Sequence, residues 1–321
     1  MFEPQKYTYH YTRADTLADK ILPSMTLRMS SLQGVNDPRE AKTWPFKFYS
    51  RSQAGNQLFT PALFDEATKY ITQRSLVFCC SRDDPSLDKN DDTRIIRSGY
   101  GHPRMWAQYA DNHRGICLVL DLERLHESIV SKFGADNLFF GSVEYLNTIH
   151  GPTSHLSRGG YDLVYLEDYV NYGLAKVMES HIRLFQKELF FTKHQDWQDE
   201  WEYRWVLRSQ SGVPVYIPIH DCLHAVILGH DCPTDMTDRV IELCRISNTP
   251  VHRMLWHGWT FSILPNQLNE DFHQGPVLFF DGISFSTRIP CGGVFAQGRD
   301  QYGKVRPIRI DNNGDVVPME G

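Results

Sequence analysis

The stretch EWEYRWVLR, residues 200–208, alternates charged and apolar side chains. An alternation with a period of two is typical of a β-strand, whose successive side chains point to opposite faces of a sheet. The pattern therefore predicts a strand that carries Glu200, Glu202 and Arg204 on one face and the intervening aromatic residues on the other. Two carboxylates and one guanidinium would then share a single surface.

This surface allows two interpretations. An arginine beside two crowded carboxylates can keep one acid ionised and raise the proton affinity of the other. The pair would then supply a charge stabiliser and a proton acceptor side by side, as in an enzyme active site. A solvent-facing strand with a structural ion pair would show the same pattern, so residues 200–208 alone leave both interpretations open.

The early segment KYTYHYT, residues 6–12, also alternates and predicts a strand, followed by a helix with Leu17, Ile21 and Leu22 on its apolar face. Alternation separates His10 from the tyrosines on either side of it. A lone histidine in such a strand is usually a structural residue. His10 by itself therefore does not predict a ligand contact.

Three further segments contain polar or aromatic candidates. The segment NDPRE, residues 36–40, is a turn in which the Asn36 side chain either binds a ligand or closes an Asx turn. The segment SLVFCCS, residues 75–81, predicts a short buried strand that ends at Ser81. The segment RMWAQYA, residues 104–110, predicts a helix in which Tyr109 either packs in the core or stacks on a flat ring.

The rest of the chain mixes short strands with helices. Helices are expected at residues 61–74 and about 165–187, and a strand at 141–146. From about residue 264 the chain is rich in Gly and Pro, with short apolar runs. We therefore expect an α+β fold with a main domain at residues 1–263 and a small β-rich C-terminal extension at residues 264–321.

The composition excludes several classes of protein. A net charge of −6 argues against bulk electrostatic binding of nucleic acid or an anionic membrane. Seven scattered cysteines without a CxxC pair favour reduced thiols, and no leader or transmembrane-length apolar run is present, so a cytoplasmic protein is expected. Rossmann dehydrogenases, P-loop enzymes, α/β-hydrolases and zincins are not expected, because their motifs are absent, and the His and Cys residues at 220–232 match no common zinc spacing.

Read in order, the segments resemble one bacterial family. YHYT, NDPRE, the strand ending in CCS, MWAQYADNHRGICLVLD and the pattern WxxExEYR within residues 193–204 resemble the family DUF2971 over roughly residues 7–262. That family is similar to the ADP-ribosyltransferases, which bind NAD in a cleft without a Rossmann fingerprint. The resemblance implies an ADP-ribosyltransferase-like split β-sheet with flanking helices, and NAD+ as a substrate.

The resemblance also implies roles for individual residues around NAD+. His10 would contact the ribose, with Tyr11 and Thr12 beside it in the YHYT motif. Ser81 would help to frame the nicotinamide pocket. Glu202 would hydrogen-bond the ribose 2′-hydroxyl and stabilise positive charge on the ribose as the nicotinamide bond breaks.

Four other residues receive implied roles. Glu200 would orient or deprotonate the acceptor. Tyr109 would stack on nicotinamide, Asn36 would contact the cofactor, and Arg204 would hold Glu202 or reach a phosphate. The spacing leaves open whether Glu200 or Glu202 is the catalytic carboxylate, although Glu202→Gln is expected to abolish the reaction and leave the fold intact.

The implied function is an NAD-consuming ADP-ribosyltransferase, a bacterial toxin or anti-phage defence effector that modifies RNA, DNA or protein. An antitoxin or another regulatory partner would accompany such a protein. Two alternatives stay open: a nuclease that uses the cleft of His10, Glu200 and Glu202 together with Asp37 and Glu40, and a non-catalytic module that senses a nucleotide.

Overall fold

The computed structural model describes residues 2–42, 46–52, 57, 59–87, 94–147, 163–258 and 260–265, together with short strands farther along the chain. The chain divides into two compact units, Met1–Asn266 and Gln267–Gly321. The predicted boundary after residue 263 falls inside the last strand of the first unit, β14 (Thr260–Pro265), because this strand pairs with its neighbour as far as Pro265. The first unit therefore ends slightly later than expected.

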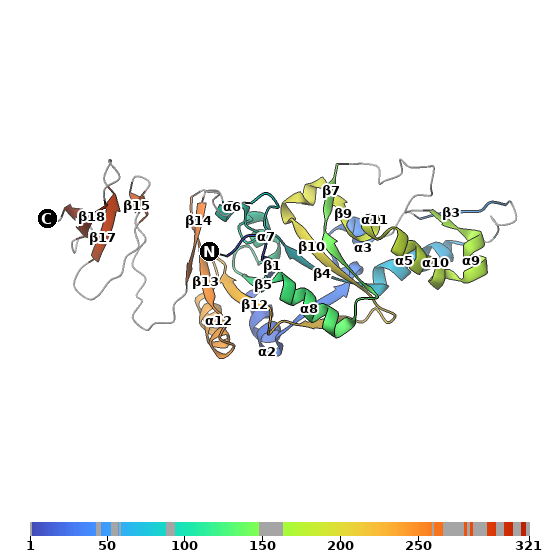
Figure 1. The fold of residues 1–321 in the computed structure, drawn as a ribbon, viewed down its shortest axis with the longest axis horizontal. Coiled ribbons are helices and arrows are strands. Elements are labelled where there is room, and N and C mark those ends of the chain that lie inside the picture. Colours follow the sequence, from blue (N-terminus) through green and yellow to red (C-terminus); the bar gives the residue numbers. More distant parts are fainter. Residues whose placement is uncertain are drawn as a thin grey trace. The chain divides into compact units, whose positions relative to one another are not determined.

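A ten-stranded mixed sheet forms the centre of the first unit (Figure 1). Its main path is β11 (Val215–Pro218), β2 (Thr26–Ser31), β4 (Ser75–Ser81), β1 (Tyr7–Thr12), β5 (Ile116–Asp121), β12 (Leu223–Leu228), β13 (Val251–His257) and β14. In addition, β10 (Glu202–Arg208) pairs with β4 and with β6 (Leu138–Ser142). The strand pair β12–β13 is parallel and the other pairs described for this sheet are antiparallel, so the predicted α+β class is confirmed.

The strand β4 is the point at which this sheet splits. Along one edge, β10 pairs with β4 over its full length. Along the other edge, β2 pairs with the start of β4 at Leu76 and Val77, whereas β1 pairs with its end at Ser81. Residues 78–80 lie between these two ladders. The sheet therefore opens beside the middle of β4.

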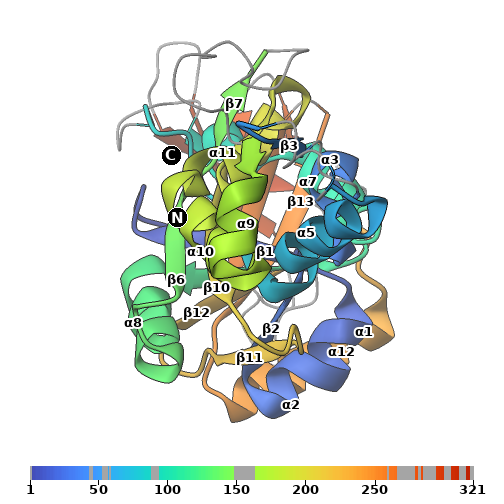
Figure 2. The same ribbon diagram turned by 90° about the vertical axis from the view of Figure 1, so that its right-hand side faces the viewer.

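Helices cover both faces of the sheet. One apolar cluster packs β-strand residues against the helical segments η1 (Leu17–Ile21), α2 (Leu22–Ser24), α8 (Leu122–Phe133) and α12 (Thr234–Ile246). A second apolar cluster involves the helices α5 (Pro61–Arg74), α10 (Leu174–Leu184) and α11 (Gln186–Phe190). A third cluster involves α7 (Pro103–Tyr109). In Figure 1, α5, α9 (Leu166–Tyr172) and α10 gather at one end of the unit, and Figure 2 looks onto this end.

Local signals explain several element boundaries. The helix α5 spans the predicted residues 61–74 because Thr60 caps it, accepting a hydrogen bond from the backbone of Leu63, and Pro61 begins it. The segments 6–12 and 75–81 form β1 and β4, as predicted. The shorter elements are α1 (Ala14–Thr16), η2 (Leu32–Gly34), α3 (Pro38–Ala41), β3 (Lys47–Tyr49), α6 (Arg94–Arg97), β7 (Glu144–Leu146), β8 (Leu163–Tyr165), α9 (Leu166–Tyr172), β9 (Thr192–His194) and η3 (Gln195–Glu200).

Two predicted elements are wrong as single units. The helix expected at about 165–187 is divided into α9, α10 and α11, and Gly173 separates the first two with a positive φ of 75°. The strand expected at 141–146 is divided between β6, which pairs with β10, and β7, which pairs with β9.

The described elements of the second unit are all strands, as expected for a β-rich extension. They are β15 (Phe279–Phe280), β16 (Ile283–Ser284), β17 (Val294–Arg299), β18 (Val305–Ile310) and β19 (Val316–Pro318). The first two pair with each other, and the last three form a small antiparallel sheet. Within the described ranges, no helix combines the length and apolar character needed to cross a bilayer, and six of the cysteines are free thiols.

Candidate active site

A cavity of about 350 Å³ lies at the split in the sheet. Residues 9–11 of β1, residues 28 and 30–31 of β2 and residues 77–81 of β4 line it. Because consecutive strand residues alternate between faces, a lining of consecutive residues means that the cavity follows the strand edges. The wall is completed by Gly34, Val35, Asn36, Met105, Tyr109, Lys193, Glu200, Glu202 and Arg204.

This cavity brings together the residues predicted from the sequence, with one exception. His10, Tyr11, Asn36, Ser81, Tyr109, Glu200, Glu202 and Arg204 all line it. Thr12 is buried at the end of β1, where it pairs with Ile116 of β5, and it is not part of the lining. The predicted contact between Thr12 and a cofactor therefore stays a prediction, and the other predicted residues line the cavity without it.

His10 lies at the split itself. Its Nδ1 is 3.2 Å from the backbone oxygen of Cys79, and its ring packs against Phe78 with 5.1 Å between ring centroids. Because a carbonyl oxygen only accepts hydrogen bonds, we assign the proton to Nδ1, which leaves Nε2 as an acceptor in the neutral ring. Burial lowers the pKa of His10, which keeps the ring neutral at pH 7.

The neighbouring Tyr11 has a packing role. Its hydroxyl donates a hydrogen bond of 2.7 Å to the backbone oxygen of Gly99, and its ring meets Trp106 edge to face. Tyr11 and Tyr9 both belong to the apolar cluster under α7, whereas His10 lies on the other side of the strand, as alternation predicts. The Tyr11 hydroxyl therefore has its own partner inside the protein.

Arg204 organises the carboxylates beside the cavity. Its Nε and Nη2 donate to Glu202, its Nη1 and Nη2 donate to Glu40, and the remaining Nη1 hydrogen donates to the backbone oxygen of Phe190 at 2.8 Å. These bonds use all five donors of the guanidinium group. Arg204 holds Glu202, as one of its two predicted roles requires, but the predicted reach to a phosphate is wrong because no donor remains for a ligand.

Glu202 is almost fully engaged by this network. Besides its two bonds from Arg204, its Oε2 lies 2.7 Å from Lys193 Nζ, and the thiol of Cys79 hydrogen-bonds the carboxylate. Burial alone would raise the pKa of Glu202, but Arg204 and Lys193 outweigh it and lower the pKa to about 2. Since a carboxylate offers about four acceptor sites, little capacity remains for a ligand.

Glu200 reaches the same cluster by a different route from the one predicted. It ends η3, whereas β10 begins at Glu202, and Trp201 between them has a left-handed φ of 41°. Strand alternation therefore does not place Glu200. Instead, the Ser81 hydroxyl donates a 2.7 Å hydrogen bond to the backbone oxygen of Glu200 and fixes the end of η3 against β4.

The Glu200 carboxylate retains acceptor sites. Its Oε1 accepts a 2.7 Å hydrogen bond from the Tyr109 hydroxyl, and its Oε2 accepts a 2.8 Å bond from Lys193, which also contacts Glu202. These bonds leave about two of its four acceptor sites for a ligand. Lys193 is a bridge between the two carboxylates. Burial opposes its charge, but the surrounding carboxylates raise the pKa of Lys193 above its ordinary value.

Tyr109 and Asn36 complete this side of the cavity. The Tyr109 hydroxyl donates to Glu200 and is hydrogen-bonded by the Asn36 side chain. Burial and the charge of Glu200 raise the pKa of Tyr109 above its ordinary value, so the hydroxyl stays protonated. Tyr109 therefore orients Glu200, and its ring lies along the cavity wall where a flat ligand ring could contact it.

Three residues of the site were not predicted as NAD contacts from the sequence. Lys193 gave no signal beyond its place at the start of the WxxExEYR run, and Glu40 was considered only as a nuclease group. Arg28 lies on β2, where Leu27 and Met29 are buried and Arg28 is exposed. Alternation along β2 could have indicated that Arg28 points away from the core.

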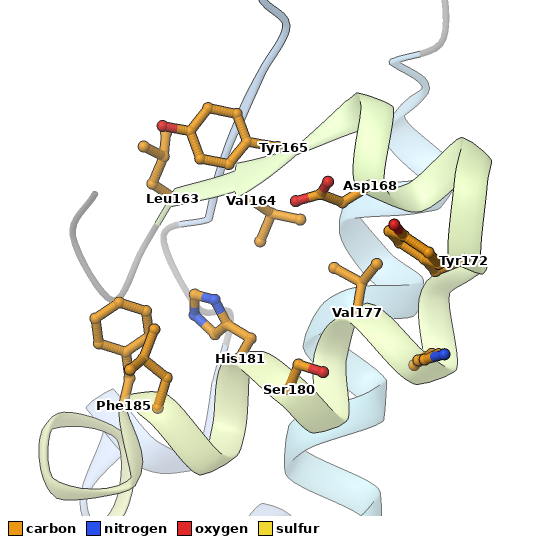
Figure 3. Close-up of a pocket in the computed structure, with 11 residues that line it drawn as sticks. Leu163, Val164, Tyr165, Asp168, Tyr172, Val177, Ser180, His181 and Phe185 are labelled. Carbon is orange, nitrogen blue, oxygen red and sulfur yellow. The ribbon is translucent and has the colours of Figure 1, made fainter. Parts of the chain in front are cut away.

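A second, larger cavity of about 540 Å³ lies between β8, α9 and α10 (Figure 3). Val164, Val177 and Phe185 give it an apolar wall, and His181 and Asp168 are among its polar side chains. None of the residues predicted from the sequence lines it. The chemistry that the sequence suggested is therefore concentrated in the cavity at the split.

Comparison with known proteins gave a match to one family model over part of the chain. Residues 105–205 match the family model described as "Protein of unknown function (DUF2971)". The matched range includes Tyr109, Lys193, Glu200, Glu202 and Arg204, and over these residues it agrees with the resemblance to DUF2971 that the motifs indicated; the segments YHYT, NDPRE and CCS lie outside it. Neither the curated proteins nor the solved structures gave a match.

Proposed function

We propose that the cavity at the split in the sheet, beside β4, binds NAD+. We propose further that the protein is an ADP-ribosyltransferase and that its sheet is the split sheet expected of such enzymes. The observation that carries the proposal is the gathering of His10 of β1, Glu200 of η3 and Glu202 of β10 around one opening in the sheet. The cavity volume falls within the range of about 300–1,000 Å³ that is usual for small-molecule sites.

The charge of the site suits the nicotinamide end of NAD+. Three carboxylates, Glu40, Glu200 and Glu202, surround two cations, Lys193 and Arg204. When all are ionised, negative charge is in excess by one. A buried cluster of this kind favours the cationic pyridinium ring and the positive charge that develops on the ribose in the transition state.

The uncharged groups of the cavity suit the rest of the nicotinamide riboside. The neutral His10 ring offers Nε2 as an acceptor for a ribose hydroxyl. The open edge of β4 between the ladders of β1 and β2 carries backbone groups with which a carboxamide can form hydrogen bonds. The ring of Tyr109 lies on the cavity wall, where nicotinamide could contact it.

In the proposed reaction the bond between ribose C1′ and the nicotinamide nitrogen breaks, and its electron pair leaves with nicotinamide. The resulting positive charge on the ribose is stabilised by the carboxylate cluster. A nucleophilic group of the acceptor then bonds to C1′ and loses its proton, and Glu200 has the free acceptor sites to take it. We propose a macromolecular acceptor, RNA, DNA or protein, as for a bacterial toxin or anti-phage effector.

Incubation of the protein with NAD+ labelled on its adenine ring tests this proposal. With RNA, DNA and a protein extract as acceptors, we expect release of free nicotinamide and transfer of the label to one class of macromolecule. His10→Ala should reduce both signals together. Absence of nicotinamide release and of transfer with every acceptor would refute the proposal.

Two further measurements separate the other interpretations. Cleavage of RNA or DNA without NAD+ would indicate a nuclease. Thermal stabilisation by a nucleotide without turnover would indicate a sensing module.

A further inference from the structure

Arg28 lies where the ladder between β2 and β4 ends. Ser30 pairs with Val77, so the same antiparallel register, continued, would place Arg28 opposite Cys79, at the middle of the split. The strand neighbours of Arg28 are buried in the core, whereas Arg28 itself is exposed and lines the cavity. Its guanidinium is therefore on the open side of the cavity.

The charges of the cavity fall into two groups. The buried group contains Lys193 and Arg204, whose charges are matched by direct contacts with three glutamates. Arg28 has no ion pair or side-chain hydrogen bond with any residue that the structure describes. Counted together with Glu40, which lies behind Arg204, the buried group is therefore negative when its carboxylates are ionised, whereas Arg28 makes the exposed part positive.

A ligand with a cationic end and an anionic end fits such a cavity. We propose, on the basis of the function proposed above, that Arg28 binds the diphosphate of the dinucleotide. A guanidinium group forms two parallel hydrogen bonds with phosphate oxygens, and an exposed arginine without an internal partner has its donors available for them. Ser30 and Ser31 are half-buried and also line the cavity, and Ser30, which is on the same face of β2 as Arg28, offers a further hydroxyl donor for the phosphates.

This contact fixes the direction in which the dinucleotide enters. The nicotinamide riboside points toward Glu200 and Glu202, and the diphosphate lies against β2. The two ends of the ligand then contact opposite walls of the split. Arg28 therefore selects for ligands that carry phosphate next to the ribose, whereas the buried cluster selects for the cationic ring.

Calorimetric titration of the full-length protein tests this inference with three probes. NAD+ carries both ends, ADP-ribose carries the diphosphate without nicotinamide, and nicotinamide riboside carries the cationic ring without phosphate. For Arg28→Gln we expect the Kd for NAD+ and ADP-ribose to rise about tenfold or more, with no change for nicotinamide riboside. Arg28→Lys should lie between this variant and the wild type, because it keeps the charge and loses the paired donors.

The matched control is Arg245→Gln, which removes an exposed arginine of α12 that pairs with Glu242 on its own helix. It should leave all three affinities unchanged. If Arg28→Gln binds every probe as the wild type does, or weakens all three equally, the role of Arg28 is refuted while NAD+ binding by the wild type still supports the proposed function. If the wild type binds none of the probes, both proposals fail.

Discussion

Glu200 and Glu202 differ in how much of each carboxylate the protein already uses. Both are buried, but Glu202 is held by Arg204 and Lys193 together, whereas Glu200 is held by Tyr109 and Lys193. Glu202 therefore anchors the charge network, and Glu200 retains acceptor sites toward the cavity. The spacing of the two residues in the sequence could not separate these roles.

We expect Glu200→Gln and Glu202→Gln to fail in different ways. Glu200→Gln should lower nicotinamide release by about hundredfold or more and cost about 1–3 kcal/mol of unfolding free energy. Glu202→Gln should cost about 3–5 kcal/mol, because it leaves Arg204 and Lys193 buried with one carboxylate fewer. Urea unfolding and nicotinamide release, measured on both variants, check these values.

The expectation from the sequence that Glu202→Gln leaves the fold intact is revised by this network. If Glu202→Gln unfolded at the same urea concentration as the wild type, the structural role assigned to Glu202 would be wrong. If Glu200→Gln kept full activity, Glu200 would not take part in the reaction.

His102 gives the folded protein a dependence on pH below neutrality. Its ring packs edge-on against Trp201, 4.5 Å between centroids, and burial lowers the pKa of His102 from 6.5 to about 4. As the pH falls below 6.5, the unfolded chain binds a proton that the folded chain does not, so the free energy of unfolding falls until the pH approaches about 4. This group therefore stabilises the fold at pH 7 relative to pH 5.

His102→Gln removes that titration. Between pH 7 and pH 5, we expect the variant to lose about 2 kcal/mol less unfolding free energy than the wild type. Urea unfolding curves at pH 7, 6 and 5 measure the difference, and other histidines contribute equally to both proteins. Parallel losses in the two proteins would contradict the lowered pKa of His102.

At the scale of single elements, the sequence predicts what depends on neighbouring residues. Alternation along β10 correctly places Glu202 and Arg204 on one face. It does not place Glu200, because the backbone at Trp201 is left-handed. This backbone is held from the end of β4, where the Ser81 hydroxyl donates to the backbone oxygen of Glu200 and the backbone N–H of Arg82 donates to that of Trp201. Such contacts have no counterpart in a local pattern.

The charge network of the site could not be predicted from local sequence patterns, because its partners are far apart in the sequence. Arg204 and its partner Glu40 are 164 residues apart in the sequence. Lys193 lies on β9, and its two partners are Glu200 at the end of η3 and Glu202 at the start of β10. Its buried ion pairs therefore depend on how these three elements meet. The motifs indicated which segments carry the polar groups of the cavity, and the fold determines which of these groups already have partners inside the protein.

The interrupted helix between α9 and α10 leads to a prediction about Gly173. This glycine has a φ of 75° and a ψ of 157°, a combination essentially restricted to glycine that costs a residue with a Cβ about 1–3 kcal/mol. An added Cβ would meet nothing within 4 Å, so Gly173→Ala should lower the free energy of unfolding by about 1–3 kcal/mol through the backbone alone.

Gly34→Ala is the matched control. Its added Cβ also meets nothing within 4 Å, but Gly34 lies in η2 without a left-handed φ. We expect this variant to be neutral or slightly more stable than the wild type. Urea unfolding of both variants compares them, and equal effects would mean that the backbone at Gly173 is not strained by a side chain.

At the scale of the whole molecule, the first unit contains a complete sheet and its own core. The ten strands of the sheet and the three apolar clusters all lie within residues 2–265. All seven tryptophans precede residue 260. Tryptophan fluorescence of the full chain therefore reports on the unfolding of this unit.

Two truncations test where the unit ends. A chain that stops after Asn266 keeps the whole of β14, so its urea midpoint and m value by fluorescence should equal those of the full chain. A chain that stops after Ile263 lacks Leu264 and Pro265, which pair with β13. We expect it to be less stable by about 1–2 kcal/mol, because those ladder contacts are lost. Equal stability of the two truncated chains would show that the end of β14 contributes nothing, and it would favour a boundary after residue 263. A lower stability of both truncated chains than of the full chain would mean that residues 267–321 stabilise the first unit.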